Sequence, residues 1–196
     1  PAMASLNLIL MHIEAGWNEY YAGQGNIAAN GFGSSVKQRV EKDHQYVQAY
    51  HMLAGAKWNH MIDSAHTGFH SWDDHHWTYP VVREVIPIPR AKMLVQFRGQ
   101  EGCHVGNYWQ DRSYPCSDDF TRPDTESVVI DIGSRGDVDF DYQLRCDKPW
   151  AKFSRESGSV RIPKQGAFTM ESVTVTCDRS LLQESREKAL IEVCGE

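Results

Sequence analysis

The chain has 196 residues and a formal net charge of −6, a length that suffices for one or two domains with buried cores. Hydrophobic residues make up 41% and charged residues 23% of the chain, as in ordinary globular proteins. The acidic balance and the lack of a basic patch argue against nucleic acid and acidic lipid headgroups as partners. No apolar run reaches about 18 residues, so the sequence predicts no membrane-spanning helix.

The first predicted element is an amphipathic helix over residues 6–21. Its large apolar side chains recur every three or four residues and share one face. These residues are Leu6, Leu10, Ile13, Trp17 and Tyr20. Four glycines between residues 22 and 33 are expected to end this helix.

A second, longer helix is expected from Ser35, which resembles an N-cap with Gln38 as its capping-box partner. Apolar residues continue at helical spacing to Ala65, and no proline intervenes before Pro80, so the helix would have roughly 30 residues. The stripe includes Met61 and lies next to Trp58, and we expect both of these residues to be buried. Two helices cannot bury both apolar stripes by themselves, so we expect the hairpin to belong to a helix bundle that continues upstream of Ser5.

After Pro80 the periodicity of the sequence changes from about 3.6 to 2. Residues 81–89 carry two prolines and fit an extended linker or an edge strand. Turn residues separate the later strand-like segments, and Ser157–Ser159 is read as one such turn. No helical pattern intervenes, which indicates an antiparallel sandwich. The predicted strands are Met93–Phe97, Val128–Ile132, Val138–Cys146, Val173–Cys177 and Ala189–Val193.

The predicted fold class is therefore α+β, with an N-terminal helical hairpin followed by a small antiparallel immunoglobulin-like β-sandwich. We expect a helical segment over residues 5–78 and a sandwich over 126–196. Between them, residues 79–125 form an extended connection with one strand and a long aromatic loop. Residues 5–66 should be mainly helical and residues 126–196 mainly strand.

A segment at the junction of the two halves, residues 57–80, is unusually rich in aromatic and imidazole side chains. It holds Trp58, Trp72 and Trp77 of the six tryptophans, together with five of the nine histidines. The run AYHMLAGAKWNHMIDSAHTGFHSW resembles the end of the helical domain of glycoside hydrolase family 115, the xylan α-glucuronidases. In that family a similar Lys-Trp-Asn-His-Met helix end leads through a His-x-Gly-aromatic turn to a Tyr-Trp and a proline.

The second half is similar to the small immunoglobulin-like modules, including BACON-type ones, that are appended to bacterial polysaccharide-degrading enzymes. The matching features are Trp150 after the long strand, the Ser157-Gly158 pair, the Val173–Asp178 strand and the closing Ile191–Val193. The glycine usual before the last strand is replaced here by Glu-Ser-Arg-Glu. Family 115 proteins place such a β-region after their helical domain, so the order of the two halves agrees with the family.

The resemblance implies a non-catalytic accessory fragment of a polysaccharide-degrading enzyme, because the family's catalytic carboxylates lie on a barrel that would precede it. It implies a xylan or glucuronoxylan context, with hemicellulose of the plant cell wall and the parent chain's catalytic domain as partners. A secreted, periplasmic or cell-surface location would follow. The alternatives are a purely structural or dimerising scaffold, which could form a homodimer, and an independent hydrolase, the least supported.

The chemistry-bearing residues do not form a defensible catalytic or metal site. His66 and His70 are four residues apart, but Gly68 lies between them and no closed ligand set follows, so we favour capping and core hydrogen bonding. We expect no cofactor and no tightly bound transition metal between His60 and His76. The adjacent Asp73 and Asp74 are expected to be exposed in a turn, rather than opposed across a sugar as glycosidases require.

Aromatic residues outside the regular elements are the remaining candidates for a binding site. Trp72, Trp77, Tyr108 and Trp109 lie beside amides and carboxylates, a pairing that suits carbohydrate recognition because sugar C–H faces stack on indole rings. These rings could instead fill the seam between the helical and β parts, which the sequence favours because large aromatics dominate such interfaces.

The sequence has five cysteines, an odd number, so at least one thiol is unpaired within the chain. Cys103 and Cys116 lie in polar, glycine-bearing sequence and could close a loop between them. The other three lie in strand-like sequence, where buried thiols are common.

Overall fold

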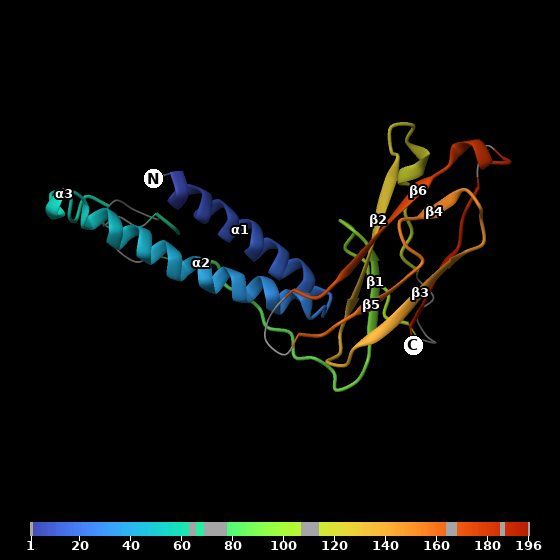
Figure 1. The fold of residues 1–196 in the computed structure, drawn as a ribbon, viewed down its shortest axis with the longest axis horizontal. Coiled ribbons are helices and arrows are strands. Elements are labelled where there is room, and N and C mark those ends of the chain that lie inside the picture. Colours follow the sequence, from blue (N-terminus) through green and yellow to red (C-terminus); the bar gives the residue numbers. More distant parts are fainter. Residues whose placement is uncertain are drawn as a thin grey trace.

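The computed structural model describes residues 2–62, 66–68, 78–106, 114–163, 168–184 and 187–195. A helical hairpin projects from one side of two antiparallel sheets, and the molecule is elongated along the hairpin (Figure 1). This arrangement confirms the predicted α+β class with a hairpin followed by a small β-sandwich.

The hairpin consists of α1 (Ala2–Gly23) and α2 (Ala28–His51), joined by a turn at residues 24–27. Gly25 adopts a left-handed φ of 68° in this turn, a conformation that glycine adopts without strain. The Asn26 side chain then accepts a hydrogen bond from the backbone N–H of Ala28 at 3.0 Å, which satisfies a donor at the start of α2. The predicted start at Ser35 is therefore wrong by about two turns, and the Ser35 hydroxyl instead donates to Glu14 across the hairpin at 2.6 Å.

The two helices meet through a face of α1 that is partly polar. Asn7, Met11, Asn18 and Tyr21 are its buried residues, and they recur every three or four positions. A bidentate ion pair between Glu14 and Arg39, with both N–O distances at 2.6 Å, lies in the same contact. The predicted apolar stripe lies on the other side of α1. Of the residues in this predicted stripe, Leu6, Ile13 and Trp17 are exposed, and Leu10 and Tyr20 are half-buried.

The second helix ends much earlier than the predicted stripe implied. Within the described residues between His51 and Ile62, the one further helical element is α3 (Leu53–Ala56), whose Ala54 and Gly55 have left-handed backbone angles. The side chain of His51 accepts a hydrogen bond from the backbone N–H of His60, so the chain folds back after the helix. The prediction that Trp58 and Met61 are buried is wrong, because without a continued helix they are 42% and 65% exposed.

In the part of the chain that the structure describes, seven strands form two antiparallel sheets. One sheet has the order β1-β2-β6-β4, from Met93–Phe97, Ser127–Ser134, Glu171–Cys177 and Ala151–Phe153. The other has the order β5-β3-β7, from Ser157–Val160, Phe140–Cys146 and Ile191–Gly195. Two short 3-10 helices, Asp119–Thr121 and Arg179–Leu181, lie in the connections. The strand at residues 93–97 belongs to the sandwich, since it pairs with β2 along its length.

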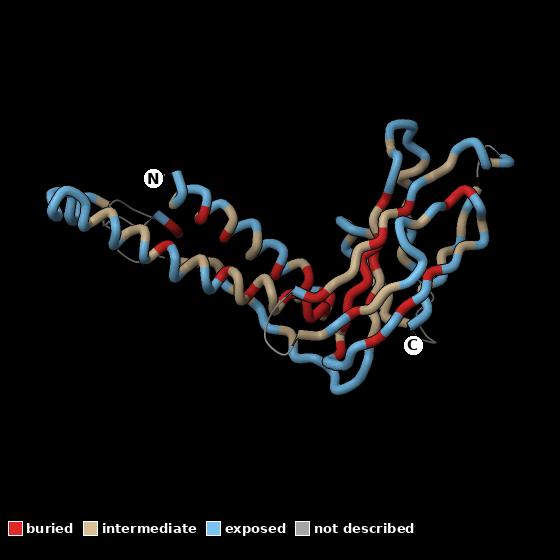
Figure 2. The backbone as a smooth tube through the Cα atoms, in the orientation of Figure 1, coloured by how far each residue is buried: buried red, intermediate tan, exposed pale blue. Residues whose placement is uncertain are grey.

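The core lies between the sheets, and buried residues recur along the strands (Figure 2), because alternate side chains of a strand face opposite sides. The alternation predicted for Val138–Cys146 is confirmed from Phe140 onward, because Phe140, Tyr142 and Leu144 are buried while the residues between them are exposed; Val138 precedes β3 and is exposed. The reading of Ser157–Ser159 as a turn is wrong, since these residues form most of β5. The buried apolar residues are Val128, Ile130, Ile132, Phe140, Tyr142, Leu144, Trp150, Ala151, Val160, Val173 and Val175.

Candidate functional site

The four aromatic residues predicted to bind carbohydrate, Trp72, Trp77, Tyr108 and Trp109, lie outside the described residues. Five further residues discussed in the sequence analysis also lie outside the described residues, so the predictions about them stay untested. They are His70, Asp73, Asp74, His75 and His76. A candidate site must therefore be built from the surfaces that the described residues form.

The tip of the hairpin contacts the outer face of the β1-β2-β6 sheet. The backbone N–H of Ile27 donates to the carbonyl of Ser134 at 2.9 Å, and the Arg135 guanidinium donates to the carbonyl of Gln24 at 2.9 Å. Asn26 lies over Gly133, where an added Cβ would come within 2.5 Å of its amide nitrogen. Gly133 thus permits the close approach of the turn to the sheet.

Two buried or half-buried asparagines attach the extended segment at residues 82–88 to the hairpin. Asn18 donates to the carbonyl of Arg83 at 2.9 Å and accepts from the Arg83 N–H at 2.7 Å. Asn30 forms the same pair of bonds with Val85, both at 2.8 Å. Asn18 also donates to the carbonyl of Ala29, so its side chain holds α1, α2 and the segment together.

An ion pair between a buried carboxylate and a half-exposed arginine lies where the hairpin meets the sheet. Asp131 on β2 is fully buried and receives two hydrogen bonds from Arg98, at 2.7 and 3.0 Å, and one from Ser172. Burial raises the pKa of the Tyr21 hydroxyl, and the negative charge of Asp131 raises it further while Arg98 opposes the shift. The phenol of Tyr21 therefore stays neutral at physiological pH beside a paired carboxylate.

Aromatic rings fill the angle between hairpin and sheet, and we call them the aromatic cluster. Tyr21 and Phe32 stack almost parallel at 5.7 Å, and Trp17 stacks on Tyr21 at the same distance. Phe168 meets Phe32 edge-on at 5.2 Å, and Tyr20 packs against Tyr21. The rings predicted to fill this seam, Trp72, Trp77, Tyr108 and Trp109, lie outside the described residues, and the aromatic cluster consists of other residues. Trp17, Tyr20 and Tyr21 lie within five positions of α1, whereas Phe32 and Phe168 join them only through the fold.

A second polar network lies in the outer half of the hairpin, where Asp43 of α2 is almost fully buried. Its carboxylate accepts from the Tyr79 hydroxyl at 2.9 Å and lies 2.7 Å from Nε2 of His66. Burial and this carboxylate both raise the pKa of Tyr79. The network holds residues 66 and 79 against the hairpin, which is the hydrogen-bonding role expected for His66.

Among the described residues, no group of three or more His, Cys, Asp or Glu side chains is arranged so that it could hold a metal ion. Cys103 and Cys116 are free thiols, so no disulfide closes the loop between them. Burial raises the pKa of the Cys103 thiol, which disfavours its reactive thiolate form.

The outer side of α1 carries a continuous row of exposed hydrophobic side chains, which we call the apolar stripe. Their spacing of three, three, four and four residues places them along one face of the helix. Its members and exposed fractions are Met3 (59%), Leu6 (47%), Ile9 (57%), Ile13 (50%) and Trp17 (36%). Such a contiguous apolar face is typical of an interaction surface.

No protein-family model and no curated protein matches the sequence. In the part of the chain that the structure describes, no helix has the length and apolar character needed to cross a membrane. The apolar stripe is the strongest candidate functional surface.

Proposed function

We propose that this chain is a non-catalytic accessory part of a polysaccharide-degrading enzyme resembling the family 115 α-glucuronidases. In this proposal the apolar stripe of α1 packs against helices next to the catalytic domain. The exposed stripe is the observation that carries the proposal, since hydrophobic residues at helical spacing suit a neighbouring helix. It also agrees with the sequence argument that this hairpin belongs to a larger bundle.

The size of the stripe fits docking within a larger assembly. Full burial of one large apolar side chain contributes about 1.5 to 3 kcal/mol, and the five side chains are about half exposed. Covering the rest of each would contribute roughly 1 kcal/mol, or roughly 5 kcal/mol together. That amount stabilises contact between tethered domains, but it leaves little surplus after the entropy lost when two separate proteins associate.

The joint between hairpin and sandwich supports a scaffold role. The hydrogen bonds of Asn18, Asn30 and Arg135, together with the aromatic cluster, connect the two halves at several points. A domain docked on α1 would therefore be held in a defined position relative to the sandwich. This is what an accessory module needs in order to place a catalytic domain, and a secreted, periplasmic or cell-surface enzyme is the proposed setting.

The carboxylates of the described residues support the non-catalytic reading. Asp131 and Glu14 are each bound by an arginine, and Asp43 is bound by Tyr79 and His66. Arg39 and Ser35 also hold the pKa of Glu14 below its ordinary value. Glycosidic cleavage instead needs an acid with a raised pKa and a second carboxylate across the sugar.

The test joins this chain by a flexible linker to the catalytic domain and adjoining helices of a family 115 α-glucuronidase, because tethering lowers the entropy cost of association, and follows the contact between them by small-angle X-ray scattering. We expect a compact, docked particle with the wild type and its loss with the double substitution Leu6→Glu and Ile13→Glu. The matched control is Gln38→Glu with Gln48→Glu on the exposed side of α2, which should dock normally. Equal docking by both double variants would refute docking through the stripe, and glucuronic acid release by this chain alone would refute the non-catalytic role.

Dimerisation of this chain through the same stripe is the alternative to docking on the catalytic part of an enzyme. Light scattering during size-exclusion chromatography separates the two cases, because only self-association would make the wild type dimeric and the stripe variant monomeric. A dimer that persisted when this chain is linked to the catalytic domain would favour the dimerisation scaffold over the accessory role.

Carbohydrate binding is a second candidate, favoured by the exposed rim of the aromatic cluster. Trp17 and Phe168 are 36% and 50% exposed at the two ends of a ring stack. Affinity electrophoresis in glucuronoxylan should show retardation that falls in Trp17→Ala, and separately in Trp72→Ala and Trp109→Ala. A wild type that migrates alike with and without xylan would rule this candidate out.

A further inference from the structure

The extended segment at residues 82–88 is held on one side in the way that a strand is held in a sheet. Asn18 exchanges two hydrogen bonds with the backbone of Arg83, and Asn30 exchanges two with Val85, all between 2.7 and 2.9 Å. In an antiparallel sheet a neighbouring strand bonds the N–H and C=O of every second residue in the same manner. The two asparagine amides therefore take the place of a neighbouring strand and fix this segment along the hairpin (Figure 1).

The backbone groups between these anchor points face the other way and have no partner. The N–H and C=O groups of successive residues in an extended chain point to opposite sides, so those of Val82, Glu84 and Ile86 point away from the asparagines. None of these groups makes a hydrogen bond within the part of the chain that the structure describes. They form an unpaired strand edge, which we call the 82–86 edge, with a donor and an acceptor on each residue.

The position of proline in this segment keeps the 82–86 edge complete. Proline in an edge strand commonly places its missing N–H on the open side, where it blocks further pairing. Pro87 instead has the parity of the residues bonded to the asparagines, so the open side keeps the N–H groups of Glu84 and Ile86. Beyond the edge, Ile88 donates a hydrogen bond to the carbonyl of Arg135 at 2.9 Å. The edge is thus held extended at both ends.

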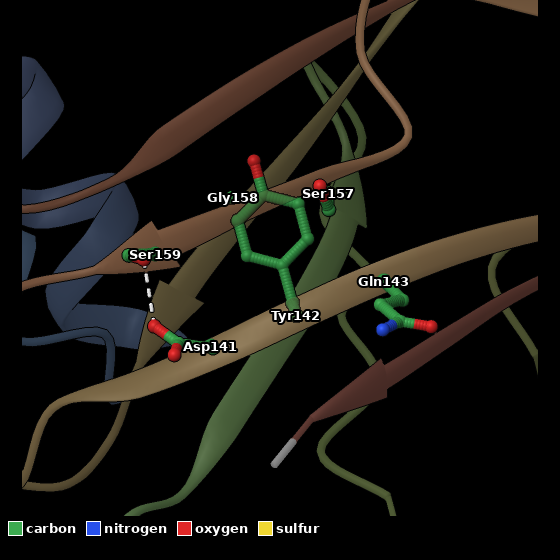
Figure 3. Close-up of a pocket in the computed structure, with 6 residues that line it drawn as sticks. All are labelled: Asp141, Tyr142, Gln143, Ser157, Gly158 and Ser159. Carbon is green, nitrogen blue, oxygen red and sulfur yellow. Dashed lines mark hydrogen bonds between the residues drawn. The ribbon is translucent and has the colours of Figure 1, made fainter.

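The edge strand β5 of the sandwich is less suited to pairing. It has only four residues, and short edge strands offer few bonds to a neighbour. The Tyr142 ring of β3 lies across Gly158 of β5, and Ser159 donates a hydrogen bond to Asp141 at 2.6 Å (Figure 3). No large apolar side chain is exposed on β5, whereas Ile86 on the 82–86 edge is 88% exposed.

The charges on the 82–86 edge determine which kind of strand fits it. Glu84 is exposed and makes no ion pair with the described residues, whereas Arg83 is already paired with Glu19 at 2.8 Å. Side chains directly opposite each other on antiparallel strands interact, and like charges there are destabilising. A cationic residue opposite Glu84 and a β-branched residue opposite Ile86 therefore fit best.

A second copy of this chain fits poorly, because joining all the open groups of two copies would place Glu84 opposite Glu84. We propose that the 82–86 edge binds an extended basic segment of another protein, which adds to it as an antiparallel strand. Because the edge is held extended beforehand, less conformational entropy is lost on binding. The inference depends neither on docking through α1 nor on carbohydrate binding.

The test titrates the end-blocked peptide Ser-Val-Thr-Lys-Thr-Val-Ser into the intact chain and follows backbone amides by NMR. In the proposed register its lysine lies opposite Glu84 and its valines opposite Val82 and Ile86. The peptide should shift the amides of Glu84 and Ile86 saturably and slow their hydrogen exchange, which bonding to the peptide requires. The absence of saturable shifts, or shifts without slower exchange at these two amides, would overturn the proposal.

Exchanging the charges tests the preference for a basic strand. The same peptide with glutamate in place of lysine should bind the wild type about fivefold more weakly. Glu84→Lys should reverse this order of affinity. Glu126→Lys, at an exposed glutamate just before β2, is the matched control and should keep the wild-type order. Equal affinity of the wild type for the two peptides would overturn the proposal.

Blocking the backbone tests the mode of binding. Ile86→Pro removes a donor that has no partner in this chain, so the melting temperature should not fall while peptide affinity falls at least about tenfold. A peptide methylated on the backbone nitrogen of its lysine should bind as weakly, and this arm leaves the chain unchanged. Undiminished binding in either arm would refute strand addition. A dimer of the wild type that Ile86→Pro abolishes, seen by light scattering, would overturn the choice of partner.

Discussion

Substitution of Asn18 is the most informative single perturbation of this fold. The Asn18 side chain is fully buried on α1, and its amide makes three hydrogen bonds to backbone groups: the carbonyls of Ala29 and Arg83 and the N–H of Arg83. Asn18→Ala removes all three bonds and leaves their backbone partners in a site that water reaches only in part.

The expected loss of stability follows from those three bonds. Each contributes about 1 kcal/mol net, and a buried group left without a partner adds to the cost, so we expect about 3 to 5 kcal/mol in total. For a chain of this length each kcal/mol shifts the melting temperature by about 2 to 4 °C, so a fall of roughly 10 °C is expected. Asn18→Asp should be at least as harmful near neutral pH, because its carboxylate would face two carbonyl oxygens.

Urea unfolding followed by circular dichroism measures the free energy of unfolding, and differential scanning calorimetry measures the melting temperature. Gln38→Ala, at an exposed position of α2, is the control and should change the free energy by no more than about 0.5 kcal/mol. If Asn18→Ala lost no more stability than this control, the attachment of the 82–88 segment through asparagine would be refuted.

Two ion pairs give further predictions. Arg39 and Ser35 lower the pKa of Glu14 from its ordinary value of 4.5, so this carboxylate binds a proton more weakly in the folded state than in the unfolded state. The stability that the Glu14 carboxylate contributes is therefore full above pH 4.5 and is lost as the pH falls through the lower folded pKa. Glu14→Gln should therefore reduce the slope of unfolding free energy against pH below 4.5, and an unchanged slope would contradict this. Arg98→Met leaves the buried Asp131 without its arginine and should cost about 3 to 5 kcal/mol, as urea unfolding would show. A cost below about 1 kcal/mol would mean that this carboxylate is not held by Arg98.

The fold class could be predicted because both helix and strand leave a local pattern in the sequence. Five alternating positions between Val138 and Cys146 sufficed to indicate the central strand, since each side chain's direction depends only on its neighbours. The order of a hairpin followed by a sandwich came from the same change of periodicity. The ends of the helices were harder to predict from the sequence. Ser35 resembles an N-cap, but it lies inside α2 and donates a hydrogen bond to Glu14 instead.

The surfaces that matter for function depend on contacts distant in sequence. Gly31 and Gly33 suggested a long loop, but both lie in α2, where a Cβ at position 33 would lie 3.2 Å from the amide nitrogen of Asn18, a tight contact. Trp58 lay on an apparent helical stripe, and it is exposed because the helix ends at His51.

The distribution of polar and apolar residues on α1 is the reverse of that of an ordinary surface helix. Asn7 and Asn18 lie on the side that packs against this chain, and Leu6 and Ile13 lie on the side that faces outward. On the inner side, Asn7 and Asn18 donate hydrogen bonds to backbone carbonyls, and Met11 and Tyr21 are buried beside them. The outer side has no such partners among the described residues, and its composition is that of a buried surface. We therefore infer that α1 is an interior helix of a larger assembly, and charged substitutions along its outer side should affect association far more than the stability of this chain alone.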